Sequence, residues 1–163
     1  MKQEKNNFGS QLIVTSVMMI ICGLWHMLWR ILSTFVSVTD KVQGFGTESF
    51  VYNEISSYFE ILGSGSSMAA VHRLLMTVVV PLQIGCGIVG IIIAAIISKK
   101  NITAIKIIPF ISGLAMCIVG AVSALTAAVS GTVPVLVCVF LVFTLFIVPV
   151  LYEAFAVRAL IGG

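Results

Sequence analysis

Six polar or ionisable side chains fall inside or beside long apolar stretches of this 163-residue sequence. A charge at the centre of a bilayer costs about 2.5 to 3.5 kcal/mol on insertion scales, so such residues usually face protein or water. These six residues are therefore the candidate polar membrane site: His26, Arg30, His72, Arg73, Gln83 and Glu153.

The four basic members of this set stand on two neighbouring apolar stretches. His26 and Arg30 are four residues apart, so they share one face of a helix. His72 and Arg73 open the next stretch and could complete a cationic cluster that binds an anion or a lipid headgroup. The alternative is structural: Arg30 reaches toward the membrane surface or pairs with a loop acid, and His72 and Arg73 are ordinary interfacial charges. The two histidines also allow haem ligation, although we expect His26 to lie deeper than His72.

The other two residues of the candidate polar membrane site are Gln83, which is uncharged, and Glu153, which is acidic. Gln83 lies close to Pro81, which leaves a backbone carbonyl without a donor in the middle of a helix. Such groups occur in transport pathways, but an amide that bonds a neighbouring helix is the more common case. Glu153 is the one acid close to an apolar stretch, so it is the candidate proton or cation carrier. Its place at the end of that stretch favours a solvated or lysine-paired carboxylate. Pro149, just before it, is expected to kink the last helix.

A glycine-rich pattern lies in the second apolar stretch, from Gly85 to Gly90. It matches GxGxxG, but a dinucleotide site requires that motif in a turn between a strand and a helix. Inside an apolar stretch the pattern predicts close packing of helices, because small residues let membrane helices approach. The predicted packing residues are Gly85, Gly87, Gly90, Gly120, Ala124 and Ala128.

Several classes of function lack the residues they need. The four cysteines show no paired spacing, so neither a metal site nor a disulfide is expected. No nucleophile elbow, HExxH sequence, phosphate loop or pair of carboxylates is present, so we expect no catalytic residue, no cofactor and no enzyme. The nine cations are scattered and form no basic stripe, which argues against nucleic acid as a partner.

Composition and run length define the elements that carry these residues. The chain is 60% hydrophobic and 9% charged, whereas soluble domains carry about 25% charged residues. Four apolar stretches, at about 12–38, 74–97, 107–129 and 133–152, are long enough to cross a bilayer. They are continuous rather than alternating, which favours helices over barrel strands. We predict an all-α polytopic protein, a single membrane domain over 1–163 built as a four-transmembrane-helix bundle.

The charges of the connections predict an orientation. Lysines and arginines flank the N-terminus, the connection around residue 100 and the C-terminus, whereas the connection over 39–71 is mainly acidic. Because basic residues favour the cytoplasm, both termini are expected there, in a protein of the plasma membrane.

The outer connection over 39–71 contains its own periodic segment, at 48–62. Apolar residues recur there at helical spacing with acids on other faces, which predicts an extracytoplasmic amphipathic helix. An acidic helix suits a partner protein better than lipid headgroups. The candidate partner surface is Val51, Glu54, Ile55, Tyr58, Glu60 and Leu62.

These observations favour a non-enzymatic accessory or assembly subunit of a larger membrane complex. Its partners would be the lipid bilayer and other membrane subunits or copies of itself. The alternative is a small homo-oligomeric channel or transporter lined by His26, Arg30, Gln83 and Glu153. A redox anchor that binds haem or quinone through His26 and His72 is the third hypothesis.

Overall fold

The computed structural model describes residues 2–36, 67–99, 103–129 and 135–161, and every described residue is helical. Three long helices come first: α1 over Lys2–Val36, α3 over Ser67–Lys99 and α4 over Thr103–Val129. The fourth helix has three consecutive parts, α5 over Val135–Val142, η1 over Phe143–Ile147 and α6 over Val148–Ile161. The predicted all-α, four-helix membrane bundle is confirmed.

Each long helix contains a segment that is long and apolar enough to cross a bilayer. Within the described residues there are four such segments, Gly9–Leu28, Leu74–Ile97, Ala104–Val129 and Val135–Ile161. The last extends beyond the sequence expectation, which ended at residue 152. A single acid and a single arginine do not end an otherwise apolar helix, so the span continues to Ile161 and includes Glu153.

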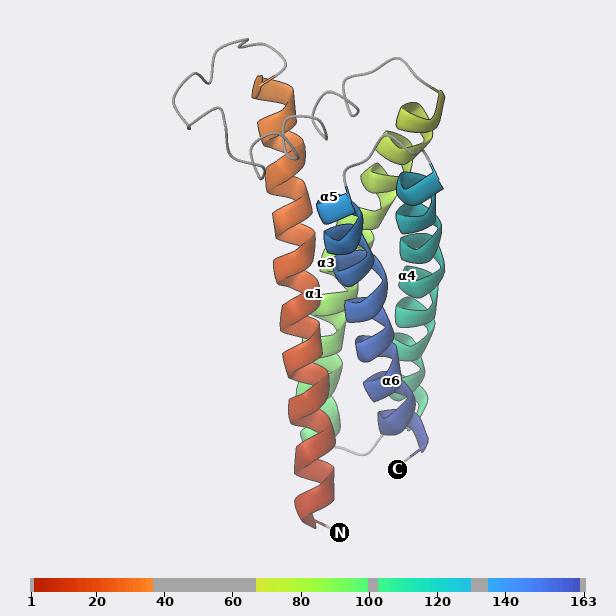
Figure 1. Cartoon of the computed structure of the whole chain (residues 1–163). Helices are drawn as coiled ribbons and strands as arrows, with labels where there is room; N and C mark the ends of the chain where they lie inside the picture. The colour runs from red at the N-terminus through yellow and green to blue at the C-terminus, as the bar shows by residue number, and fades with distance from the viewer. Residues whose placement is uncertain (1, 37–66, 100–102, 130–134, 162–163) are drawn as a thin grey trace.

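The helices form a closed ring in which α1 packs on α3, α3 on α4, α4 on α6, and α6 on α1. Figure 1 shows that α1 begins and α6 ends at the same end of the bundle, which we call the terminal end. The opposite end, where α1 ends and α3 begins, is called the loop end. The predicted helix at 48–62 lies outside the described residues.

Buried positions recur every three or four residues along each helix, which is the pattern of left-handed helix packing. The helices therefore meet along narrow seams, and lipid-facing positions lie between these seams. In α4 the buried positions at this spacing are Lys106, Pro109, Gly113, Met116, Gly120, Ser123 and Ala127.

The fourth helix widens into a π-turn at η1, and Pro149 explains why. Proline has no backbone N–H, and its ring clashes with the carbonyl four residues earlier, here that of Leu145. The N–H of Val148 bonds to the carbonyl of Phe143, five residues back, which is the π-helical pattern. The expected disturbance at Pro149 therefore takes the form of a π-turn just before it.

Candidate functional site

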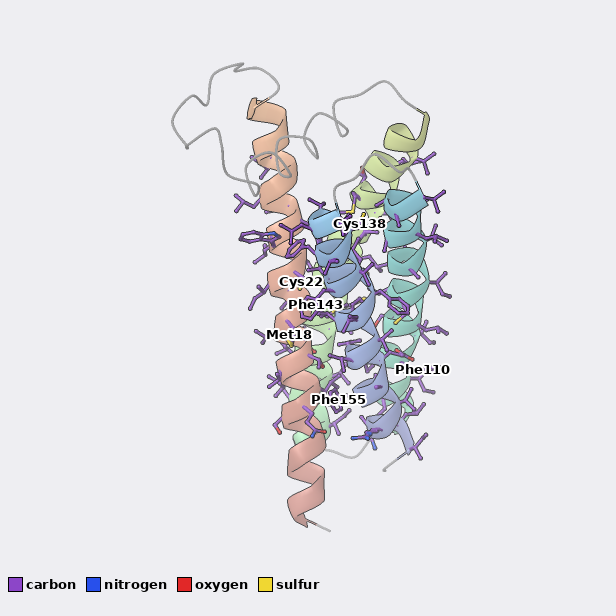
Figure 2. The ribbon with its side chains drawn as sticks, viewed as in Figure 1. Met18, Cys22, Phe110, Cys138, Phe143 and Phe155 are labelled. Carbon is purple, nitrogen blue, oxygen red and sulfur yellow. The ribbon has the colours of Figure 1, made fainter. Side chains whose placement is uncertain are left out.

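The polar groups of the membrane segments gather inside the bundle. Large apolar side chains cover the outside of all four helices, and Figure 2 shows carbon-rich side chains projecting around the length of the bundle. We call the interior set the polar seam. Its buried polar members are Thr15, Ser16, His26, Gln83, Lys106, Ser123 and Thr144.

The centre of the polar seam is the carbonyl of Thr144, in the π-turn. This carbonyl has lost both backbone donors, because Val148 bonds to Phe143 instead and residue 149 is proline. Gln83, whose side chain is 0% exposed, replaces them: its Nε2 donates to the carbonyl oxygen of Thr144 at 2.8 Å. The amide of α3 thus satisfies a defect in the fourth helix. Among the described residues the other amide atom, Oε1, has no hydrogen-bond partner.

His26 reaches the same residue from α1. Its Nε2 lies 2.9 Å from the hydroxyl oxygen of Thr144, and the histidine is 4% exposed. The Thr144 hydroxyl lies 2.9 Å from the carbonyl of Phe140, to which it can donate. Which partner donates in the contact with His26 depends on the tautomer of the imidazole ring. Nε2 is engaged in the bundle and is not available to a haem iron while the bond holds.

A second group of contacts joins the helices closer to the terminal end. The hydroxyl of Tyr152, a residue of α6 that is 0% exposed, donates to the carbonyl of Cys86 in α3 at 3.1 Å. The Cys86 thiol lies 3.3 Å from the carbonyl of Ser112, as donor to α4. Ser16 of α1 and the ring of Tyr152 both lie against Gly90. Three helices therefore hold Tyr152 in place.

Glu153 follows Tyr152 and points at α4. A Cβ added to Gly113 would overlap Oε2 of Glu153, so the glycine leaves the space that the carboxyl group occupies. Both carboxyl oxygens are buried, and neither has a hydrogen-bond partner within the described part of the chain. Glu153 lies about eight residues before Ile161, or about 12 Å along the helix at 1.5 Å per residue. Glu153, which is half-buried as a whole residue, therefore lies within the segment that is long and apolar enough to span a membrane.

The structure describes the side chains of two basic residues near this end, and neither is a hydrogen-bond partner of Glu153. Lys106 is buried, at 3% exposure, on the same face of α4 as Gly113 and two turns closer to the terminal end. Helical side chains lean toward the start of their own helix. The Cα–Cβ bond of Lys106 is therefore expected to tilt toward the terminal end, whereas that of Glu153, on the antiparallel α6, tilts toward the loop end. Arg158 is exposed, with its guanidinium 5.8 Å from the centre of the Phe155 ring.

Of the six candidate polar residues, the structure places His26 and Gln83 together at Thr144 and Glu153 separately at α4. The side chains of Arg30, His72 and Arg73 lie outside those described, so the predicted cationic cluster stays a prediction. The candidate partner surface also lies outside the described residues.

The predicted packing residues divide into inward and outward positions. Gly87, Gly90 and Gly120 lie against other helices, and Ala124 is buried. Gly85 has nothing within 4 Å of its Cβ position, and Ala128 is exposed. Residues two apart point about 200° away from each other on a helix, so Gly85 and Gly87 cannot both face a neighbour.

Sequence reasoning missed three buried residues of this region: Thr144 and Lys106 in the polar seam, and Tyr152 beside it. The available signal for Thr144 was its position five residues before Pro149. That spacing removes a backbone donor from its carbonyl if the helix is π-helical there. For Tyr152 and Lys106 no signal along one helix was available, because their burial depends on the neighbouring helices.

No protein-family model, curated protein or solved structure matches this chain. The fold and the apolar exterior define the class of protein: the chain is a polytopic α-helical protein integral to a membrane.

Proposed function

We propose that this chain is a small homo-oligomeric membrane transporter or channel in which Glu153 carries the transported or coupling cation. The observation that supports this function most directly is the buried carboxyl group of Glu153, whose oxygens lack a hydrogen-bond partner among the described residues. Ionisable groups inside membrane segments are costly, and they commonly mark ion pathways and proton relays.

Glu153 differs from the other polar residues inside the bundle in the hydrogen bonds that it makes. Tyr152, Gln83 and His26 each make a hydrogen bond to another helix, so they hold the bundle together. Glu153 makes none that the described residues provide, so removal of its charge would cost the bundle little. A costly group that contributes little to stability suits a role in transport.

A route for movement is present in the fourth helix. π-Turns inside α-helices are frequent at functional sites, and η1 directly precedes α6, which bears Glu153. A rotation of α6 about η1 would take the carboxyl group away from Gly113 and toward water at the terminal end. Copies of the chain would meet through their apolar exteriors.

The test is ion flux into liposomes that contain the purified protein. We expect an imposed pH difference to collapse faster in these vesicles than in empty ones, measured with an internal pH dye. Glu153→Gln should reduce this flux at least about tenfold, because the amide cannot release a proton near neutral pH.

Glu153→Asp is the matched variant, because it keeps the carboxyl group one methylene shorter. It should retain part of the flux. The proposal is contradicted if wild-type vesicles pass protons, sodium and potassium no faster than empty vesicles. It is equally contradicted if Glu153→Gln transports like the wild type.

A second candidate function is the accessory or assembly subunit. The observation that favours it is Gly85, on the outward face of α3, with nothing within 4 Å of its Cβ position. Small residues on an exposed helix face allow a second helix to approach closely. Under this hypothesis the second helix belongs to a different membrane protein.

For the location we propose the plasma membrane with both termini in the cytoplasm. The support is the concentration of lysine and arginine near the ends of the chain and near residue 100, against the acidic segment at 39–71.

A further inference from the structure

The Glu153 carboxyl group occupies a space that only a glycine on α4 provides. A Cβ on Gly113 would overlap Oε2 of Glu153, and the same Cβ position is 2.9 Å from the ring of Tyr152. Both oxygens are buried, within a segment long and apolar enough to span the membrane. Their immediate surroundings thus include the helix backbone at Gly113 and the aromatic ring of Tyr152.

Among the side chains that the structure describes on the elements around Glu153, no charged group is a hydrogen-bond partner of its carboxyl oxygens. From α4 the titratable groups are Lys106, whose Cα–Cβ bond is expected to tilt the other way, and the thiol of Cys117; from α3 it is the thiol of Cys86. The described titratable side chains of α1, Cys22 and His26, lie toward the loop end. On α6 itself, Tyr152 donates to Cys86 and Arg158 is exposed over Phe155.

An isolated buried carboxylate is so costly that the group takes up a proton instead. A metal cation would need several oxygen ligands around it. The described residues contain no cluster of three acidic, histidine or cysteine side chains. The nearby hydroxyl protons are also directed away: Tyr152 donates to Cys86 and Ser112 donates to Pro109. A proton needs a single oxygen, which Glu153 supplies alone.

We infer that the ligand of this site is a proton: Glu153 is a neutral carboxylic acid in the described state and a proton carrier when α6 moves. The role of Glu153 as a proton carrier rests on the proposed transport function. Its protonation state can be measured without transport.

The experiment uses the full chain in vesicles of phosphatidylethanolamine and phosphatidylglycerol, treated with dicyclohexylcarbodiimide. This apolar reagent reacts with protonated carboxyl groups inside membranes. The acid proton moves to one carbodiimide nitrogen while a carboxyl oxygen bonds to the central carbon, and the adduct rearranges to an N-acylurea. The whole reagent is added and nothing leaves, so peptide mass spectrometry identifies the modified residue.

We expect the adduct on Glu153 at neutral pH, with a rate that falls about tenfold per pH unit once the site ionises. Added sodium, potassium or lithium should not slow the reaction. Glu153→Gln should lose this adduct, and the remaining acids of the chain report on general reactivity. Lys106→Met should leave the rate unchanged, because the Cα–Cβ bond of the lysine is expected to tilt away from the acid.

Two results would overturn the inference. One is protection of Glu153 by an alkali cation, which would make the site a metal-cation site. The other is failure of Glu153 to react anywhere in the pH range, either in both the wild type and Lys106→Met or in the wild type alone. Labelling of Glu153 in vesicles without ion flux would sustain the inference and contradict the proposed function, so the two failures are distinguishable.

Discussion

At the scale of single residues, the main polar contact inside this bundle is the hydrogen bond that satisfies the carbonyl of Thr144. The carbonyl of Thr144 lacks a backbone donor because of Pro149 and the π-turn, and Gln83 supplies one from α3. Gln83 of α3 thus supplies the hydrogen bond that Pro149 removes from the fourth helix. Its unpaired Oε1 is the cost of using an amide for a single bond.

We predict that Gln83→Met destabilises the bundle by about 0.5 to 1.5 kcal/mol. The substitution removes one interhelical hydrogen bond and exchanges one orphan acceptor, Oε1, for another, the Thr144 carbonyl. The measurement is the free energy of unfolding in mixed micelles or bilayers.

The control for this prediction is a double-mutant cycle with Pro149→Ala. An alanine at 149 has an N–H that can donate to the Thr144 carbonyl in the π-helical pattern. In that background Gln83→Met should therefore cost less than in the wild type. Equal costs in the two backgrounds would mean that Gln83 is not a substitute for the missing backbone donor.

The sequence predicted part of this site and could not predict the rest. It singled out Gln83, His26 and Glu153 because polar residues in apolar runs are visible in one dimension. It missed that His26 and Gln83 meet at Thr144, because spacing along one helix does not define its neighbours. It also ended the last apolar run at residue 152, whereas α6 continues to Ile161.

At the scale of elements, the contact between α4 and the fourth helix depends on glycines opposite irregular backbone. Gly120 lies against the carbonyl of Leu145. This carbonyl receives no hydrogen bond from residue 149, because proline has no backbone N–H. Backbone atoms cannot rotate away as a side chain can. The absence of a Cβ at this position therefore determines how closely the two helices approach.

We predict that Gly120→Ala destabilises the bundle by about 1 to 3 kcal/mol, the usual cost of an added group in a packed core. Gly85→Ala is the matched control, because its Cβ position has nothing within 4 Å. It should be neutral or slightly stabilising, since alanine favours helix over glycine. Thermal unfolding of both variants in the same detergent measures the difference, and equal effects would disprove the close contact at Gly120.

At the scale of the whole molecule, the four-helix class and the approximate spans followed from hydrophobic runs alone, because a bilayer fixes both length and polarity. The ring order of the helices did not follow, because long apolar helices offer many faces of similar composition. In the structure, small residues at the helix contacts and hydrogen bonds in the polar seam determine which helices are neighbours.

The mass of the assembly distinguishes the two proposed functions. A bundle whose core holds Tyr152 and Met116 at 0% exposure has little space for a pathway of its own. A transporter of this size therefore needs other copies to enclose a route past α6. We predict that native mass spectrometry after gentle extraction gives a multiple of the 17.4 kDa chain. A complex with a different subunit of fixed stoichiometry would instead favour the accessory role, and Gly85→Phe should then release that subunit while Gly85→Ala retains it.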